Sequence, residues 1–259
     1  LVQKYTNFCA FFIPPKISSA SAAEVGSQNV VGYTKIDLAE GFNLIGSQFL
    51  EVGATTKDVN DFIFDGSALL GLDDGGEYQT TMRVWTGNGY TTYGWLDADD
   101  GTVNEVPEWN NSWLLNDFSD IAAEDMDLGK GVWLVTKKAG TITVLGEVAT
   151  GDTYTVNVVE GFNIIANPFP CEISVQNIKC DLDGLDDGGE YQTTMRLWTG
   201  NGYTTYGWLD ADDGTNNEAP EWNNSWLLND FSDLADASLK VGEAIWFVAP
   251  AAGTVTFTK

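Results

Sequence analysis

The sequence predicts an all-β protein with two tandem homologous domains, each β-sandwich or barrel-like, behind an extended amino-terminal strand segment. The first observation is a period-2 alternation of apolar and polar residues over short segments, which is typical of half-buried strands. The second is a long internal repeat, and the third is the lack of sustained helical periodicity. Gly, Asp and Asn residues, which favour turns, bound the short segments.

The internal repeat divides the chain into parts. Residues 71–120 and 184–233, offset by 113, match at all but three of their 50 positions. The Gly-Phe-Asn triplet at 41–43 recurs at 161–163 with an offset of 120, so the first copy has seven extra residues upstream of Gly71. Recent duplication and a surface that is used twice both explain the high identity. The expected parts are an amino-terminal extension at 1–29, a first β repeat at 30–148 and a second β repeat at 149–259.

The strands of the first copy are expected in close succession. They are predicted at residues 30–38, 42–50, 77–84, 90–96, 131–137 and 141–148. Asn88-Gly89 predicts a type I′ hairpin turn, because both central residues of that turn take positive φ. Residues 117–126 form the one segment in which a short helix would fit. Seven or eight strands in such a short repeat are typical of a sandwich or a partly open barrel.

The composition excludes several classes of function. With 12 Lys+Arg against 38 Asp+Glu, the formal net charge is −26, so neither nucleic acid nor an anionic membrane surface is an expected partner. The chain has no His, which excludes mechanisms that use imidazole as a base or a metal ligand. No apolar run approaches the roughly 18 residues of a membrane span. The apolar fraction of 43% is high enough for a folded core.

Some strand and turn residues of the two copies resemble those of a known module. The second copy reads Gly-Phe-Asn-Ile-Ile-Ala-Asn-Pro-Phe-Pro at 161–170 and Gly-Glu-Ala-Ile-Trp-Phe at 242–247. This pattern resembles the tandem β-rich modules of bacterial secreted and cell-surface proteins. The first copy departs from it, with Gly46-Ser-Gln-Phe49 where the module has Asn-Pro. The resemblance implies a β fold and export from the cell, and it implies no catalytic or binding residues.

Carboxylates gather directly after a predicted strand in each copy. The candidate metal ligands are Asp97, Asp99, Asp100, Asp210, Asp212 and Asp213. Ca²⁺ takes six to eight oxygen ligands, and short Asp-x-Asp loops supply them, so Ca²⁺ is the candidate cofactor. The spacing departs from the helix–loop–helix calcium pattern, because Gly101 takes a ligand place. A solvated acidic turn is the favoured interpretation.

Aromatic residues crowd the repeated block. The candidates for ligand or interface contacts are Trp85, Tyr93, Trp95 and Trp109, with their copies Trp198, Tyr206, Trp208 and Trp222. In the hairpin we expect Trp85, Tyr93 and Trp95 on one face, with Met82 and Val84 on the other. Exposed aromatic rings would stack on sugars, but aromatic residues are also common in sheet cores and interfaces. Packing or an interface is favoured over a glycan partner.

The other reactive side chains predict little chemistry. Cys171 and Cys180 are nine residues apart and could form a disulfide in an oxidising compartment, with Cys9 left over. Ser and Cys nucleophiles have no His base here, and nothing singles out one carboxylate pair for glycoside hydrolysis. We therefore expect no enzymatic activity.

The amino-terminal segment is apolar and basic. Its expected subunit-interface residues are Tyr5, Phe8, Phe11, Phe12 and Ile13. One interpretation is the remnant of a signal peptide; the other is a strand that inserts into a neighbouring molecule by β-augmentation. We favour the second, which predicts an extracellular or cell-surface structural protein that assembles head-to-tail with itself into a filament or array. The alternative is a bivalent, Ca²⁺-dependent carbohydrate-binding protein.

Overall fold

The protein is nearly all β, as the sequence predicts. The structure, a computed structural model, describes residues 31–53, 57–63, 65–97, 109–186, 189–210 and 222–259. Within those ranges the regular structure is mostly strand, with the short helix α1 (Val59–Phe62) and the 3₁₀ turn η2 (Val175–Asn177). No helix of the described residues is long and apolar enough to cross a membrane. The candidate donor residues Tyr5, Phe8, Phe11, Phe12 and Ile13 lie outside the described ranges.

The strands of the first repeat form two antiparallel sheets. In chain order they are β1 (Val31–Leu38), β2 (Gly41–Gly46), β3 (Asp65–Gly66), β4 (Thr80–Trp85), β5 (Tyr90–Leu96), β6 (Ser112–Leu115), β7 (Gly131–Thr136) and β8 (Gly140–Glu147). One sheet has the order β1-β8-β3 and the other has the order β2-β7-β4-β5-β6.

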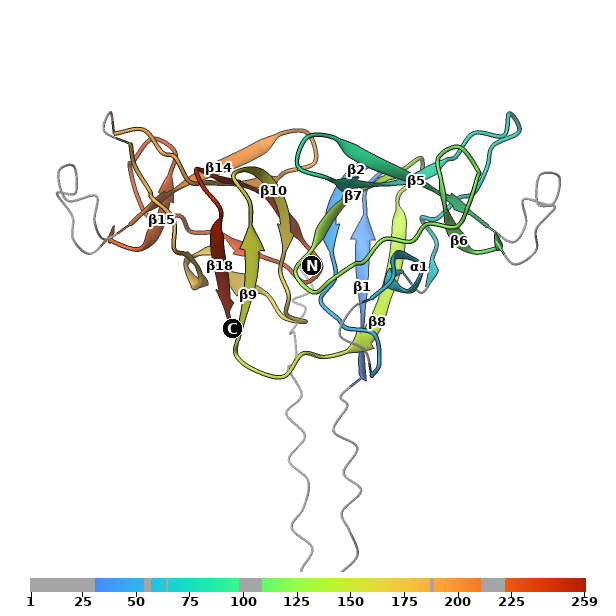
Figure 1. The fold of residues 1–259 in the computed structure, drawn as a ribbon, viewed down its shortest axis with the longest axis horizontal. Coiled ribbons are helices and arrows are strands. Elements are labelled where there is room, and N and C mark those ends of the chain that lie inside the picture. The colour runs from blue at the N-terminus through green and yellow to red at the C-terminus, as the bar shows by residue number, and fades with distance from the viewer. Residues whose placement is uncertain (1–30, 54–56, 64, 98–108, 187–188, 211–221) are drawn as a thin grey trace, which may run out of the picture.

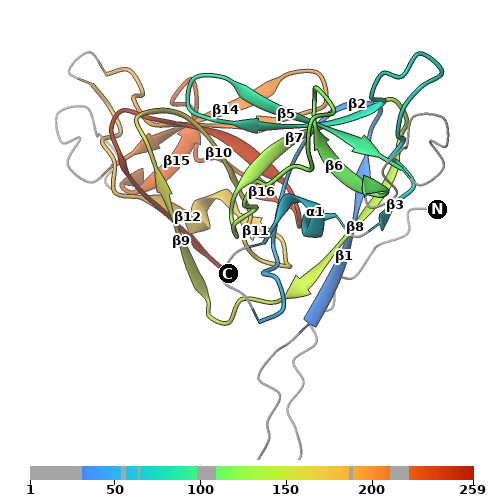
Figure 2. The same ribbon diagram turned by 45° about the vertical axis from the view of Figure 1, so that its right-hand side comes forward.

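The second repeat has corresponding strands and sheets. They are β9 (Thr153–Val158), β10 (Gly161–Ala166), β11 (Ile173–Ser174), β12 (Ile178–Cys180), β13 (Thr194–Trp198), β14 (Tyr203–Leu209), β15 (Ser225–Leu228), β16 (Ser238–Leu239), β17 (Ala244–Ala249) and β18 (Gly253–Thr258). The sheet orders β12-β18-β9 and β10-β17-β13-β14-β15 correspond to those of the first repeat, and β11 pairs with β16. Figures 1 and 2 show the two halves related by an approximate two-fold rotation.

Each repeat has a core between its three-stranded and five-stranded sheets. In the first repeat, Ile142 and Val144 of β8 pack in one apolar cluster with Met82, Trp95 and Trp113 of the larger sheet. In the second, the corresponding cluster includes Val255, Phe257, Met195, Trp208 and Trp226. Trp113, Trp208 and Trp226 are at most 1% exposed, so these large rings are structural.

The Gly-Phe-Asn triplet begins the second strand of each repeat, directly after the turn from the first strand. Gly41 has φ 94°, a left-handed conformation that favours glycine. The Asn43 side chain closes the turn, since its Oδ1 accepts a hydrogen bond from the Ala39 backbone N at 2.9 Å and its Nδ2 donates to the Ala39 carbonyl at 2.9 Å. Gly161 and Asn163 repeat this arrangement.

The two repeats pack against each other through a third apolar cluster. This cluster contains Leu44, Trp133, Ile164, Ala166, Ala244 and Trp246. Two corresponding backbone hydrogen bonds cross the contact: Gly46 N donates to the Gly242 carbonyl at 3.0 Å, and Ala166 N donates to the Gly129 carbonyl at 2.7 Å. The expected boundary at 148/149 therefore separates two halves that share a packed contact.

Corresponding residues meet where the approximate two-fold axis passes between the repeats. A Cβ atom added to Gly46 would lie 2.0 Å from the Cβ of Ala166, its counterpart in the second repeat. A Cβ added to Gly131 would lie 2.7 Å from the Cβ of Ala244, its own counterpart. Because no two carbon atoms fit at such distances, each pair has room for one methyl group, and the first repeat has glycine in both.

Two local predictions are wrong. The hairpin turn takes positive φ at Gly87 (97°) rather than at Asn88 and Gly89, and Thr86 N donates to the Gly89 carbonyl at 2.9 Å. Positive φ at the first central residue is the pattern of a type II′ turn, which needs only one such residue. Residues 117–126 form no helix, because Phe118 adopts φ 60° and Ile121 makes a β-bridge to Leu114.

Candidate functional site

The predicted aromatic residues separate into core and inter-repeat positions. Tyr93 and Trp95 are 4% and 6% exposed and belong to the first core, while Tyr206 and Trp208 are 7% and 1% exposed and belong to the second. Rings buried to this degree do not form the exposed aromatic surface that sugar stacking would need. Trp109 packs beside a small cluster of leucines, and Trp222 is half-buried.

Trp85 and Trp198 lie between the repeats. The Trp85 indole Nε1 donates to the Phe162 carbonyl at 2.7 Å, and the Trp198 Nε1 donates to the Phe42 carbonyl at 2.9 Å. Each indole thus bonds to the backbone of the opposite repeat. Trp85 also meets Trp246 edge-on with ring centroids 5.2 Å apart. These two predicted residues form an interface, and that interface is internal to the chain.

The predicted division of the hairpin faces is wrong. Met82 pairs directly with Tyr93 in the register of β4 and β5, and residues directly opposite in an antiparallel pair share a face. Tyr93 and Trp95 therefore lie with Met82 and Val84 on the core face. Trp85 points to the other side of the sheet, toward the second repeat.

The described carboxylates do not form a metal centre. Asp97 Oδ2 accepts a hydrogen bond from Gly71 N at 3.0 Å, and Asp210 Oδ2 accepts one from Gly184 N at 2.7 Å. Each of these hydrogen bonds connects the end of the second hairpin strand, β5 or β14, to the segment that precedes the hairpin. Within the described ranges no three Asp, Glu or Cys side chains gather as metal ligands. The other candidates, Asp99, Asp100, Asp212 and Asp213, lie outside those ranges.

The disulfide expected between Cys171 and Cys180 is not formed. Cys180 is a free thiol at the end of β12, where it pairs with Val255 of β18, and both cysteines pack against the second core. Burial raises the pKa of the Cys180 thiol to about 12. A thiol with so high a pKa is a weak nucleophile at neutral pH, and its role here is packing.

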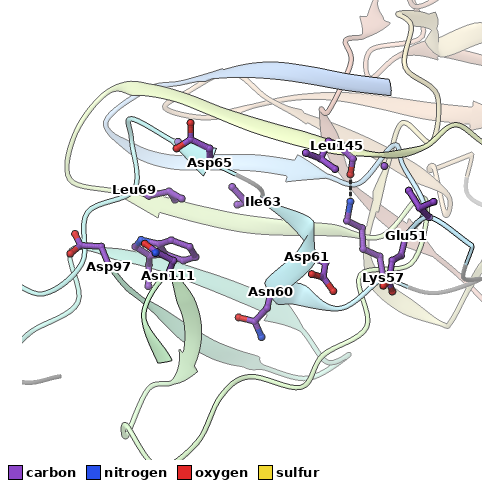
Figure 3. A pocket seen from close by; sticks show the side chains of 14 residues that line it. Glu51, Lys57, Asn60, Asp61, Ile63, Asp65, Leu69, Asp97, Asn111 and Leu145 are labelled. Carbon is purple, nitrogen blue, oxygen red and sulfur yellow. Dashed lines mark hydrogen bonds between the residues drawn. The ribbon is translucent and has the colours of Figure 1, made fainter. Parts of the chain in front are cut away.

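A cavity of about 710 Å³ opens in the first repeat, and sequence reasoning missed it. Figure 3 shows Asp65, Asp97 and Asn111 toward one end and Lys57 with Glu51 toward the other. Asp61, Trp95 and several apolar side chains complete the lining. The signal that could have located the cavity is the seven-residue excess of the first copy, because the excess falls in the segment 50–70, which lines much of the cavity.

Lys57 is the most unusual residue of this cavity. It is 2% exposed, and its Nζ donates a hydrogen bond to the Leu145 carbonyl. Burial lowers the pKa of Lys57, and the carboxylates of Asp61 and Glu51 oppose this by raising it. A buried amine with a shifted pKa in a cavity marks a candidate functional site.

A second hollow follows the edge of β9. It has a volume of about 490 Å³ and lies between the consecutive residues 154–157 of β9 and residues 127–131 of the other repeat. Trp85, Phe162 and Ile164 add apolar surface to its lining. Successive side chains of a strand point to opposite faces, so a hollow on one face would be lined by alternate residues. Four consecutive residues line this groove, which therefore runs along the edge of β9. We call it the β9 groove.

Comparison with protein-family models, with curated proteins and with solved structures finds no match for this chain.

Proposed function

We propose that the protein is a non-enzymatic extracellular structural subunit. In this proposal the two repeats are tandem β-sandwich-like domains, and the amino-terminal segment of one molecule adds a strand to the next. The resemblance of the Gly-Phe-Asn segments to modules of bacterial secreted and surface proteins supports the location. The assembly would grow head-to-tail, because the donor segment precedes the first repeat and the acceptor lies on the second.

The observation that carries the proposal is the β9 groove. Strand β9 lies at the edge of its sheet and pairs only with β18 among the described strands, so one row of its backbone groups faces the groove. An added strand gains main-chain hydrogen bonds from such an edge and specificity from pockets for alternate side chains. The apolar lining from Trp85, Phe162 and Ile164 matches a donor rich in phenylalanine.

Charge favours the same pairing. Residues 1–23 contain Lys4 and Lys16 and no acidic residue, whereas the whole chain has a formal charge of −26. Opposite charges on the donor segment and on the body of the next molecule would accelerate their encounter. Assembly should therefore slow as salt is added.

Removing the donor segment tests the proposal. We expect the full chain to form filaments or higher oligomers, and a chain lacking residues 1–16 to remain monomeric, as measured by light scattering and negative-stain microscopy. Adding a peptide of residues 1–16 to the truncated chain should give a one-to-one complex. Polymers formed by the truncated chain would rule out strand donation.

A matched pair of variants separates apolar insertion from charge. Phe8→Asp with Phe11→Asp should abolish assembly, because two aromatic anchors are lost from the donor. Asn7→Asp adds a carboxylate to the same segment without removing an aromatic ring, and it should assemble nearly as well as the unmodified chain. Equal loss in both variants would show that charge alone drives association.

A further inference from the structure

The second repeat holds one of its own lysines against a core tryptophan. The Lys179 Nζ of β12 lies 5.5 Å from the centroid of the Trp208 ring and donates a hydrogen bond to the Asn224 carbonyl. An ammonium group over an indole face is attracted by the ring quadrupole. The repeat therefore contains a built position for an alkyl ammonium, and its own side chain fills it.

The corresponding strand position in the first repeat has the opposite charge. Asp65 of β3 pairs with Thr143 of β8, and Lys179 of β12 pairs with Thr256 of β18. Thr143 and Thr256 correspond at the repeat offset of 113, so Asp65 and Lys179 occupy the same register. The first repeat thus has a carboxylate where the second has an ammonium group.

The cavity of the first repeat occupies the space beside this position. Its lining includes Trp95, Asp97 and Asn111, which correspond to Trp208, Asp210 and Asn224 of the second repeat. Their surroundings match closely, since Gly71 N bonds Asp97 as Gly184 N bonds Asp210, and Asn111 and Asn224 share positive φ values of 58° and 55°. Trp208 and Asn224, which contact the Lys179 ammonium, therefore have counterparts in Trp95 and Asn111 beside an open cavity.

The charge of the lining selects a cation. Among the described residues, four carboxylates line the cavity, on Glu51, Asp61, Asp65 and Asp97, against the single amine of Lys57. Figure 3 shows Lys57 at the end away from Asp65 and Asn111. Carboxylates in a partly enclosed site repel anions and attract cations more strongly than on an open surface.

We propose that this cavity binds a primary alkyl ammonium group, placed against Trp95, Asn111 and Asp65 as Lys179 is placed in the second repeat. The ligand is either a free aliphatic amine or the lysine side chain of another chain, since both present the same group. This site is independent of strand donation, because the cavity and the β9 groove share no lining residue.

Calorimetric titration of the full chain tests the proposal. We expect one equivalent of Nα-acetyl-lysine methylamide to bind, and Nα-acetyl-norleucine methylamide, which has the same four-carbon chain without the ammonium group, not to bind. A parallel titration with cadaverine identifies the source: tighter binding of cadaverine assigns a free amine, and tighter binding of the lysine derivative assigns a side chain. Equal binding of the norleucine compound, or no heat with either amine up to about 10 mM, overturns the proposal.

Variants at the paired positions give the control. Asp65→Lys places an ammonium where the second repeat has one, so we expect it to fill the cavity and abolish binding. Asp65→Asn keeps the shape and should weaken binding roughly tenfold, the effect of losing about one ion pair. Lys179→Ala changes the same register of the other repeat and should leave this affinity unchanged. Wild-type affinity in Asp65→Lys or in Asp65→Asn would overturn the assignment of the site.

Discussion

Lys57 and Ile173 occupy corresponding places in the two repeats. The Lys57 carbonyl accepts from Met126 N, and Ile173 pairs with Leu239, the counterpart of Met126. The two side chains are 2% and 3% exposed, so the first repeat buries an amine where the second buries an aliphatic group. Burial of an amine costs free energy unless it is charge-paired, and no carboxylate of the described residues lies within ion-pair distance of Lys57. The buried amine therefore makes the first repeat less stable than an aliphatic side chain at position 57 would.

Replacing this lysine should raise stability. We expect Lys57→Met to stabilise the protein by about 1 kcal/mol at pH 7, because removal of the buried amine outweighs the lost bond to Leu145. Between the lowered folded pKa of Lys57 and 10.5, the unfolded chain binds a proton that the folded chain does not, so the wild type gains stability as pH rises. The advantage of Lys57→Met should accordingly shrink toward pH 10.5.

Urea unfolding of both proteins between about pH 6 and 10 measures this difference. The exposed Lys35 of β1 provides the control, since Lys35→Met should change stability by less than about 0.5 kcal/mol at every pH. If Lys57→Met proved less stable than the wild type by the same amount at every pH, the amine would be serving as a structural hydrogen-bond donor instead.

Strands were the elements that the sequence predicted best. The alternation from Thr80 to Val84 marks β4 correctly, because a half-buried strand requires it. The turn at Asn88-Gly89 was placed one residue too late, since Gly87 satisfies the same hairpin with a different turn type. The wrong face of Tyr93 does not follow from the turn, because a two-residue turn at 88–89 would pair Tyr93 with Val84 and the observed turn pairs it with Met82, and both pairings place Tyr93 on the core face.

The contact between the repeats depends on Gly46 and Ala166, and strand propensity does not predict that these two residues meet. We expect Gly46→Ala to destabilise the protein by about 1–3 kcal/mol, the usual cost of overpacking, because its Cβ would lie 2.0 Å from that of Ala166. Ala166→Gly should cost about 1 kcal/mol through lost packing and a more flexible backbone. The double variant should be more stable than the sum of the two changes predicts.

A double-mutant cycle by chemical denaturation measures this coupling. Rescue should be partial, because the new Cβ at position 46 would also lie 2.8 Å from the Lys130 carbonyl. Strictly additive effects would mean that the two repeats shift apart to make room, and that the close approach is not required for stability.

At the scale of the whole molecule, the sequence shows the net negative charge but does not predict the cavity of the first repeat. The sequence shows the repeated block at residues 71–120 and 184–233, and it shows the excess of seven residues in the first copy. It does not show that the longer connection places Asp65 in the register of Lys179, because register follows from pairing across the sheet. The cavity therefore results from a difference between two repeats that share a nearly identical block of 50 residues.

The net charge should make stability depend on salt. Two ion pairs are formed among the described residues, Lys130–Glu124 and Lys240–Glu243, so most carboxylates have no basic side chain within ion-pair distance. Their mutual repulsion destabilises the compact state, and added salt screens it. We expect the Tm to rise by about 5 °C between about 20 and 500 mM NaCl.

Differential scanning calorimetry checks this expectation. KCl at equal ionic strength should give the same rise, because screening depends on ionic strength and not on the cation. A Tm that stays constant or falls would show that the carboxylates are too far apart to repel one another in the folded state.

The Gly46–Ala166 and Gly131–Ala244 pairs also decide which copies can meet. If two second repeats from different molecules faced each other in the same way, Ala166 would oppose Ala166 and Ala244 would oppose Ala244, with methyl groups in the same space. The glycines of the first repeat leave room for either partner. The chain therefore behaves like two different subunits joined by a linker. Its second repeat packs against a first repeat and not against another second repeat. Domain swaps between molecules can therefore join a first repeat to either repeat, but they cannot join two second repeats.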